Sequence, residues 1–231
     1  MRNFFVLTMI LLFSTNLLAK KSNWLTDWEV KDKDDGITIE CREHKTKINE
    51  CRYVTEVENI TVDALLAVNI DGPNLNSWTD NLISCEVIEK KHPLDYQLYM
   101  KWSFPGAINR DSITHTTVTH DAKRGYSKLS FRTVKNQKKP KDLSFVRFQA
   151  MKGTWEFEDM HNGKTKITLT QIALPGEYVQ SILYSLYNLS NRMSTRKTLV
   201  SLIDIAKTEK YRDIVIDYSV LSKNPELASI Y

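Results

Sequence analysis

Residues 96–104 read Tyr-Gln-Leu-Tyr-Met-Lys-Trp-Ser-Phe, and every second side chain from Tyr96 to Phe104 is large and apolar. A period of two places those five side chains on one face of a β-strand. Pro105 ends the strand, and the Arg110-Asp111 pair opens another segment in which polar and apolar residues alternate. The sequence therefore predicts a sheet with one strongly apolar face.

A long helix is predicted to cover that face, because residues 177–213 contain no glycine and no proline. Apolar residues in its first half recur at helical spacing: Val179, Ile182, Leu183, Leu186, Leu189 and Met193. The polar stretch 194–198 interrupts this stripe before Leu199. One helix whose first half does the covering and a break into two helices both remain open. A single curved sheet closed by one helix leaves a hollow, and a hollow lined with Trp, Phe, Met and Leu suits a lipid-like guest.

The rest of the chain alternates turn residues with short apolar segments, which is typical of an antiparallel meander. Thr61 is an N-cap for a predicted helix over residues 62–70, and Asp71-Gly72-Pro73 stops it. A change of phase between Ala150 and Trp155 predicts a bulge near Gly153. No linker or internal repeat follows residue 20, so we expect one domain over residues 20–231.

The first 19 residues have the pattern of an export signal. Arg2 gives a positive start, residues 4–13 form an apolar run, and Leu17-Leu18-Ala19 is the expected cleavage site. A permanent membrane anchor is the alternative, but residues 14–16 interrupt the run below the roughly 18–20 apolar residues that span a bilayer. The residue directly after Ala19 is Lys20 and not cysteine, so the lipoprotein form of the signal is missing. We expect a signal peptide at residues 1–19 that is cleaved from an exported protein.

Two of the three cysteines are placed to form a disulfide. Ile39 and Cys41 share a face of one predicted strand, and Cys51 and Tyr53 share a face of the next. A hairpin turning near Thr46 puts Cys41 opposite Cys51, where Cα atoms lie roughly 4.5–5.5 Å apart. An oxidising compartment permits the bond, and three buried thiols are the alternative. We expect a Cys41–Cys51 bridge and an unpaired, buried Cys85.

The composition and motifs exclude several classes of function. A formal net charge of +4 is far from that of a nucleic-acid tail. The chain has no Gly-rich phosphate loop and no Gly-x-Ser-x-Gly, His-Glu-x-x-His or Cys-x-x-Cys motif. His115 and His120 lie five apart on one predicted strand, point to opposite faces and cannot share a metal ion. We therefore expect no nucleic-acid partner, no metal, no cofactor and no enzymatic activity.

A few polar residues remain candidates for a site. Arg110 is either a polar anchor for a ligand head group or part of a structural salt bridge that fixes the preceding turn. Thr114 and Thr116 occupy a predicted mid-sheet strand, where they face either a wet cavity or solvent. The basic loops 90–92 and 138–141 are expected to be solvated, with contact to an anionic membrane as the alternative.

Several short motifs, taken in order, resemble those of the START domain, the steroidogenic-acute-regulatory-related lipid-transfer family. They cover about residues 24–210, nearly the whole mature chain. The motifs are Trp28 with Asp34-Asp35-Gly36-Ile37, Trp78-Thr79-Asp80-Asn81, Trp102-Ser103-Phe104-Pro105, Arg110-Asp111, Gly153-Thr154-Trp155, Leu174-Pro175-Gly176, and a C-terminal helix ending near Leu199-Leu202. Each motif alone is weak, but their order and spacing together are specific. With an export signal that lacks a lipobox, the chain is most similar to bacterial periplasmic members.

The resemblance implies an α+β helix-grip fold, in which a curved antiparallel β-sheet wraps around a long C-terminal α-helix. It also implies one lipid in the tunnel between them, as relatives bind sterols, phospholipids, ceramides or other hydrophobic molecules. The sequence departs from the family at Thr116, where several lipid-binding members carry a cavity arginine. That departure weakens any specific sterol or phosphatidylcholine assignment.

We therefore expect a periplasmic carrier or sensor for a lipid, sterol or fatty-acyl compound. The expected ligand-binding residues are Trp78, Tyr96, Met100, Trp102, Phe104, Arg110, Thr114, Thr116, Leu129, Phe131, Ile182, Leu186, Leu189 and Met193. One rival is a cyclase-like or hydrolase-like enzyme of the same superfamily that recruits His115, Arg110 and Tyr99. Another is an interaction module whose tunnel is filled by its own side chains. The sequence identifies neither the lipid nor the oligomeric state.

Overall fold

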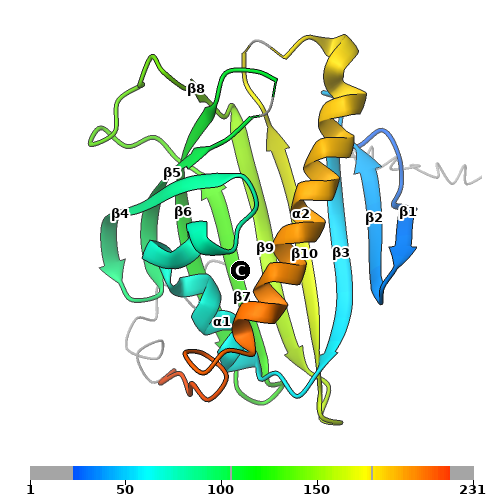
Figure 1. Ribbon diagram of the computed structural model, residues 1–231, viewed down its shortest axis with the longest axis vertical. Coiled ribbons are helices and arrows are strands. Elements are labelled where there is room, and N and C mark those ends of the chain that lie inside the picture. Colours follow the sequence, from blue (N-terminus) through cyan, green and yellow to red (C-terminus); the bar gives the residue numbers. More distant parts are fainter. Residues whose placement is uncertain (1–22, 105, 178, 219–231) are drawn as a thin grey trace, which may run out of the picture.

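The fold is α+β, a curved and predominantly antiparallel sheet with a long C-terminal helix across it (Figure 1). The computed structural model describes residues 23–104, 106–177 and 179–218, so the predicted signal peptide lies outside the described residues. The strands follow the order β1-β2-β3-β10-β9-β7-β6-β5-β4, and β8 pairs in parallel with β6. Their bounds are β1 Glu29–Asp34, β2 Ile37–Glu43, β3 Asn49–Glu58, β4 Leu82–His92, β5 Asp95–Trp102, β6 Arg110–Asp121, β7 Tyr126–Thr133, β8 Val146–Arg147, β9 Ala150–Asp159 and β10 Lys164–Leu174.

Two α-helices and two 3₁₀ turns complete the described chain: α1 Val62–Ile70, η1 Gly72–Ser77, η2 Ser181–Leu183 and α2 Tyr184–Ala206. Figure 1 shows α2 running diagonally across one face of the sheet. In its second half Leu199, Leu202 and Ala206 are fully buried, in one cluster with Leu65 and Leu66 of α1. In the described part of the chain, no helix is long and apolar enough to cross a bilayer.

Helix α1 forms over the residues that the sequence predicts. The Thr61 hydroxyl accepts a hydrogen bond from the Ala64 N–H at 3.0 Å, which satisfies one of the free donors at the helix start. Most of its side chains are buried, since the helix lies between the sheet and α2. The chain leaves α1 at Asp71, and Pro73 stands in the first turn of η1.

The β2–β3 hairpin and its disulfide are confirmed. Cys41 pairs with Cys51 and Ile39 with Tyr53, and the Cys41–Cys51 disulfide joins the two strands. Cys85 carries a free thiol that is half-buried, and burial raises its pKa to about 12.

The predicted bulge near Gly153 is wrong. Strand β9 pairs with both β7 and β10 without a register shift, and Gly153 lies opposite Phe131 and Gln171. An added Cβ at this position would lie 2.6 Å from the Phe131 ring and 2.5 Å from the Thr170 carbonyl oxygen. Position 153 must therefore be glycine because the Phe131 ring of the neighbouring strand packs against it. The change of phase in the sequence does not indicate this contact.

Helix α2 is one helix rather than two, and its predicted apolar stripe faces inward only in part. Ile182, Leu186, Leu189 and Met193 are 82%, 64%, 43% and 56% exposed. The inward face instead carries Tyr187 and a set of hydroxyl and amide side chains. The Tyr187 hydroxyl donates to the buried Ala173 carbonyl at 2.8 Å, and Asn188 ties the helix to the backbone of Lys47 and Asn49 at the β2–β3 hairpin.

The segment after α2 returns to the sheet and to α1. The Tyr211 hydroxyl donates to Asp71 at 2.6 Å, and the Tyr218 hydroxyl donates to Asp63 at 2.6 Å. The Tyr218 ring stacks on the His120 imidazole with centroids 3.5 Å apart. Burial of that imidazole lowers its pKa, although Asp63 and Asp121 act in the opposite direction.

Candidate functional site

A cavity of about 570 Å³ lies among the inward face of the sheet, η1, the β5–β6 connection and α2. This volume falls within the range typical of sites for small molecules. The lining is mainly apolar and aromatic. The predicted binding residues that line it are Trp78, Tyr96, Met100, Trp102, Phe104, Thr114, Thr116, Leu129, Phe131 and Leu186. The structure thus brings together side chains from η1, β5, β6, β7 and α2.

The lining also contains residues that the sequence reasoning missed. The apolar ones are Leu75, Leu82, Phe148, Met151, Trp155, Leu169 and Ala173, whereas Leu98, Val179 and Leu183 line the cavity on the faces that the sequence predicted. The polar ones on α2 are Ser190, Asn191, Ser194, Thr195 and Thr198. The alternation of apolar residues in β9 and β10 was sufficient to predict that Trp155 and Leu169 point inward. The inward position of the polar α2 residues could not be predicted from the sequence, because a polar stripe on a helix normally faces water.

Arg110 does not line the cavity, and its expected role as a ligand anchor is corrected. Its side chain is fully buried, Nε donates to the Pro175 carbonyl at 2.9 Å, and Nη1 donates to the Ile108 carbonyl. The guanidinium also lies 4.2 Å from the centre of the Phe104 ring. Its described partners are backbone carbonyls rather than the expected carboxylate. Arg110 therefore ties the chain after β10 to the β5–β6 connection.

Ile182, Leu189 and Met193 are the other predicted ligand contacts that lie away from the cavity. Leu189 and Met193 are exposed on α2 together with Val200, and Ile182 is exposed in η2 just before the helix. The helical period correctly groups these residues on one face. It could not indicate that this face points outward, because the inward face of the helix borders a cavity and polar partners rather than a packed core.

Most polar side chains on the α2 wall are hydrogen-bonded within the protein. Gln171 Nε2 donates to Thr195 Oγ1 at 2.6 Å, and that hydroxyl donates in turn to the Asn191 carbonyl. Asn81 Nδ2 donates to Ser194 Oγ at 3.0 Å, and the Asp80 N–H donates to Thr198 Oγ1 at 3.0 Å. These bonds connect α2 to β10 and to the η1–β4 connection, and they fix the position of the helical wall.

Three buried polar atoms of the lining have no protein partner within the described residues: Trp78 Nε1, Tyr96 Oη and Thr114 Oγ1. Tyr96 and Thr114 lie on the adjacent strands β5 and β6, where Tyr96 pairs with Thr116 and Leu98 pairs with Thr114. They are therefore diagonal neighbours on the inward face. Burial raises the pKa of Tyr96, so its hydroxyl stays protonated and remains a donor.

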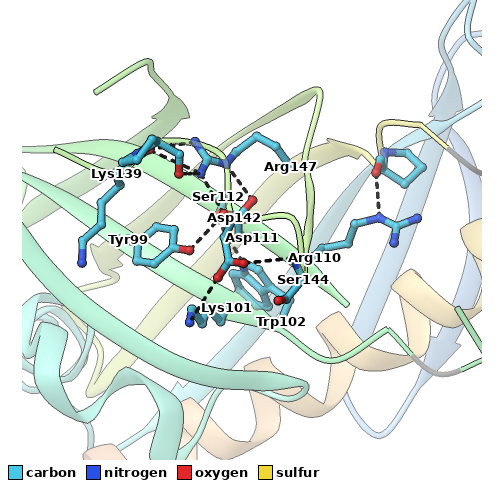
Figure 2. A network of polar contacts seen from close by, with 12 residues as sticks. Tyr99, Lys101, Trp102, Arg110, Asp111, Ser112, Lys139, Asp142, Ser144 and Arg147 are labelled. Atoms are coloured by element: carbon cyan, nitrogen blue, oxygen red, sulfur yellow. Dashed lines mark hydrogen bonds and ion pairs between the residues drawn. The ribbon is translucent and has the colours of Figure 1, made fainter. Parts of the chain in front are cut away.

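Beside the cavity, a buried ion pair fixes the loop between β7 and β8 (Figure 2). Asp111 accepts two hydrogen bonds from Arg147, at 2.6 Å from Nε and 2.8 Å from Nη2, and one from the Tyr99 hydroxyl at 3.0 Å. Arg147 also reaches the Pro140 carbonyl at 3.2 Å. Burial and the Asp111 carboxylate raise the pKa of Tyr99 to about 12. This network positions Phe148, which follows Arg147 and lines the cavity.

His115 points away from the cavity. It lies on the outward face of β6, and its Nε2 lies 2.6 Å from Asp95 Oδ1. The two residues border a second hollow of about 480 Å³ with Arg132 and Lys152. Across the described ranges, no three His, Cys, Asp or Glu side chains are grouped to hold a metal ion. His115 and Tyr99, two of the proposed enzymatic groups, therefore lie outside the 570 Å³ cavity, as does Arg110.

Solved structures with the same fold are StAR-related lipid-transfer proteins. The STAR-related lipid transfer protein from Xanthomonas axonopodis matches with a TM-score of 0.69 and 20% identity, over 79% of this chain and 100% of that one. Human StAR-related lipid transfer protein 5 matches with a TM-score of 0.67 and 14% identity, over 79% and 88%. Human STARD10 matches with a TM-score of 0.66 and 16% identity, over 76% and 73%. The START-like helix-grip fold expected from the sequence is confirmed.

Comparison of the sequence with protein-family models and with curated proteins finds no match.

Proposed function

We propose that this protein binds one hydrophobic molecule, a lipid or other fatty-acyl compound, in the 570 Å³ cavity and serves as a periplasmic lipid carrier or sensor. The single observation that carries the proposal is an apolar, aromatic hollow beneath α2 that the protein's own side chains leave open. The similarity to lipid-transfer structures supports it.

The energetics of such a site need no covalent step. Each methylene removed from water contributes about 0.8 kcal/mol, so a twelve-carbon chain contributes on the order of 9 kcal/mol before ordering costs. The charged or titratable groups usual in catalysis are sparse in the described lining, where Asp80 is the one ionised side chain. A binding role therefore suits the cavity better than the cyclase or hydrolase alternative.

The periplasmic location is part of the proposal. The export-signal pattern of residues 1–19 and the Cys41–Cys51 disulfide support it, because such bonds persist in oxidising compartments.

Contact with a membrane during loading and release is also part of the proposal, through the exposed stripe Ile182, Leu186, Leu189, Met193 and Val200. No acidic residue occurs between Glu177 and Asp204, whereas Arg192 and Lys197 do; Arg196 in the same stretch is already paired with Asp32, Asp34 and Asp35. An apolar stripe among basic residues suits an anionic lipid surface. In sedimentation with phosphatidylglycerol vesicles, Leu189→Glu should weaken binding. Leu143→Glu, at a leucine 98% exposed on another loop, should not.

Native mass spectrometry of protein purified from its own compartment tests the binding role. We expect a co-purifying mass in the range of a lipid, which is lost in Ala173→Trp, where the added ring would occupy the cavity. Ala122→Trp, in an exposed turn, is the matched control and should keep the bound mass. A bare mass for the unsubstituted protein, together with no uptake of a pyrene-labelled alkane, would contradict the proposal.

A further inference from the structure

We infer that the cavity takes an uncharged lipid with an oxygen acceptor at its polar end, such as a diacylglycerol, bound by the donors Trp78 Nε1 and Tyr96 Oη together with Thr114 Oγ1. This inference rests on the proposed function, because it names the class of ligand that the same cavity takes.

The first argument is the chemistry of the three atoms. Each is buried, belongs to the cavity lining, and has no hydrogen-bond partner in the described part of the protein. A buried polar group without a partner is costly, and native structures rarely keep one without a reason. An indole N–H only donates, and the protonated Tyr96 hydroxyl has its proton available. Oxygen atoms of an ester, carbonyl or hydroxyl group satisfy both donors.

The second argument is position. Tyr96 and Thr114 are diagonal neighbours on the inward face of β5 and β6, so one ligand group can contact both. Trp78 directly follows η1, and its indole meets the Trp155 ring edge-on, with ring centroids 6.4 Å apart, within the same lining. The donors are therefore placed within the aromatic part of the cavity rather than in a solvated loop.

The third argument is charge. The described lining contains no Lys or Arg, and its one acidic residue, Asp80, accepts an exposed hydrogen bond from Asn81 Nδ2 at 3.0 Å. Arg110 bonds the carbonyls of Pro175 and Ile108 instead. A phosphate or free carboxylate in this cavity would lose its hydration without meeting a basic side chain in the described lining, which disfavours binding. The electrostatics of the lining therefore select an uncharged polar end.

Equilibrium binding of three fluorescent probes tests the inference: a diacylglycerol, a phosphatidic acid with the same acyl chains, and a pyrene-labelled alkane. We expect the diacylglycerol to bind at least tenfold tighter than the phosphatidic acid. Tyr96→Phe and Thr114→Val remove one polar atom each with little change of shape. Each should lower the ratio of diacylglycerol to alkane affinity about threefold to tenfold, as expected for loss of one hydrogen bond.

Matched controls are Thr119→Val, on the outward phase of the same strand as Thr114, and Tyr126→Phe on β7. Both should leave that ratio unchanged, and circular dichroism checks that each variant is folded. Equal or tighter binding of the phosphatidic acid would overturn the inference while leaving the proposed function intact. An unchanged ratio in both cavity variants would overturn it as well, since the unpartnered atoms would then be satisfied by water alone. If none of the probes binds, the proposed function fails and the inference fails with it.

Discussion

Replacing Arg147 with methionine should destabilise the protein far more than a typical surface substitution. The Asp111 side chain is 1% exposed and Arg147 is 21% exposed, and two hydrogen bonds of 2.6 and 2.8 Å join them. Removing one partner of a buried pair typically costs about 3–5 kcal/mol, because the remaining charge stays desolvated. Since Arg147 is partly solvated, we expect the lower end of that range, a loss of about 3 kcal/mol.

Urea and thermal denaturation followed by circular dichroism measure this loss. A domain of this size loses about 2–4 °C in Tm per kcal/mol, so Tm should fall by about 6–12 °C. Arg132→Met, at an exposed arginine on the outward face, is the matched control and should stay within about 0.5 kcal/mol. Asp111→Asn combined with Arg147→Met should recover part of the loss, because the unpaired charge is gone. A loss below about 1 kcal/mol in Arg147→Met would refute the view that this network is stabilising.

Three further predictions concern stability. The Cys41→Ala/Cys51→Ala variant should lose about 2–3 kcal/mol in denaturant unfolding, because the bond closes a loop of sequence separation 10; an equal stability with and without reductant would contradict this. Gly153→Ala should lose about 2–3 kcal/mol, because the added Cβ meets a backbone carbonyl at 2.5 Å; the outward neighbour Thr154→Ala should lose less. Because the folded pKa of His120 is lowered below its unfolded value near 6.5, the unfolded chain takes up a proton first as pH falls. The stability that depends on neutral His120 is therefore fully present above about pH 6.5 and is lost as the pH falls further. His120→Gln should thus reduce the fall in unfolding free energy between pH 7.5 and 5.5. The matched variant His161→Gln, at an exposed histidine, should leave that fall unchanged.

Much of the fold could be predicted because it depends on local periods. The alternation from Tyr96 to Phe104 gives the inward face of β5 and the start of the following connection, and Thr61 with Asp71-Gly72-Pro73 bounds α1 as observed. The facing positions of Cys41 and Cys51 follow from counting residues on either side of one tight turn. In each case the physical cause operates within a strand, a helix or a hairpin.

The candidate site was predictable only in part. Side chains on the inward phase of β5, β6 and β7 reach the cavity as expected, because strand alternation assigns them to one face. The α2 wall was mispredicted. Its apolar stripe was taken as the inward face, but Ile182, Leu189 and Met193 point outward, and much of the inward face consists of the polar residues that bond Gln171, Asn81 and Ala173.

The amino-acid order by itself determined which residues share a face: the apolar side of the sheet, the two stripes of α2 and the pairing of two cysteines. Only the tertiary structure decided which of those faces turns inward, where Arg110 finds its carbonyl partners, and why position 153 must be glycine. The physical reason is that periodicity is a property of one element, whereas burial depends on what packs against that element. For α2 the opposing surface is a hollow edged by polar groups, so hydroxyl and amide side chains can face inward while Leu189 and Met193 face outward.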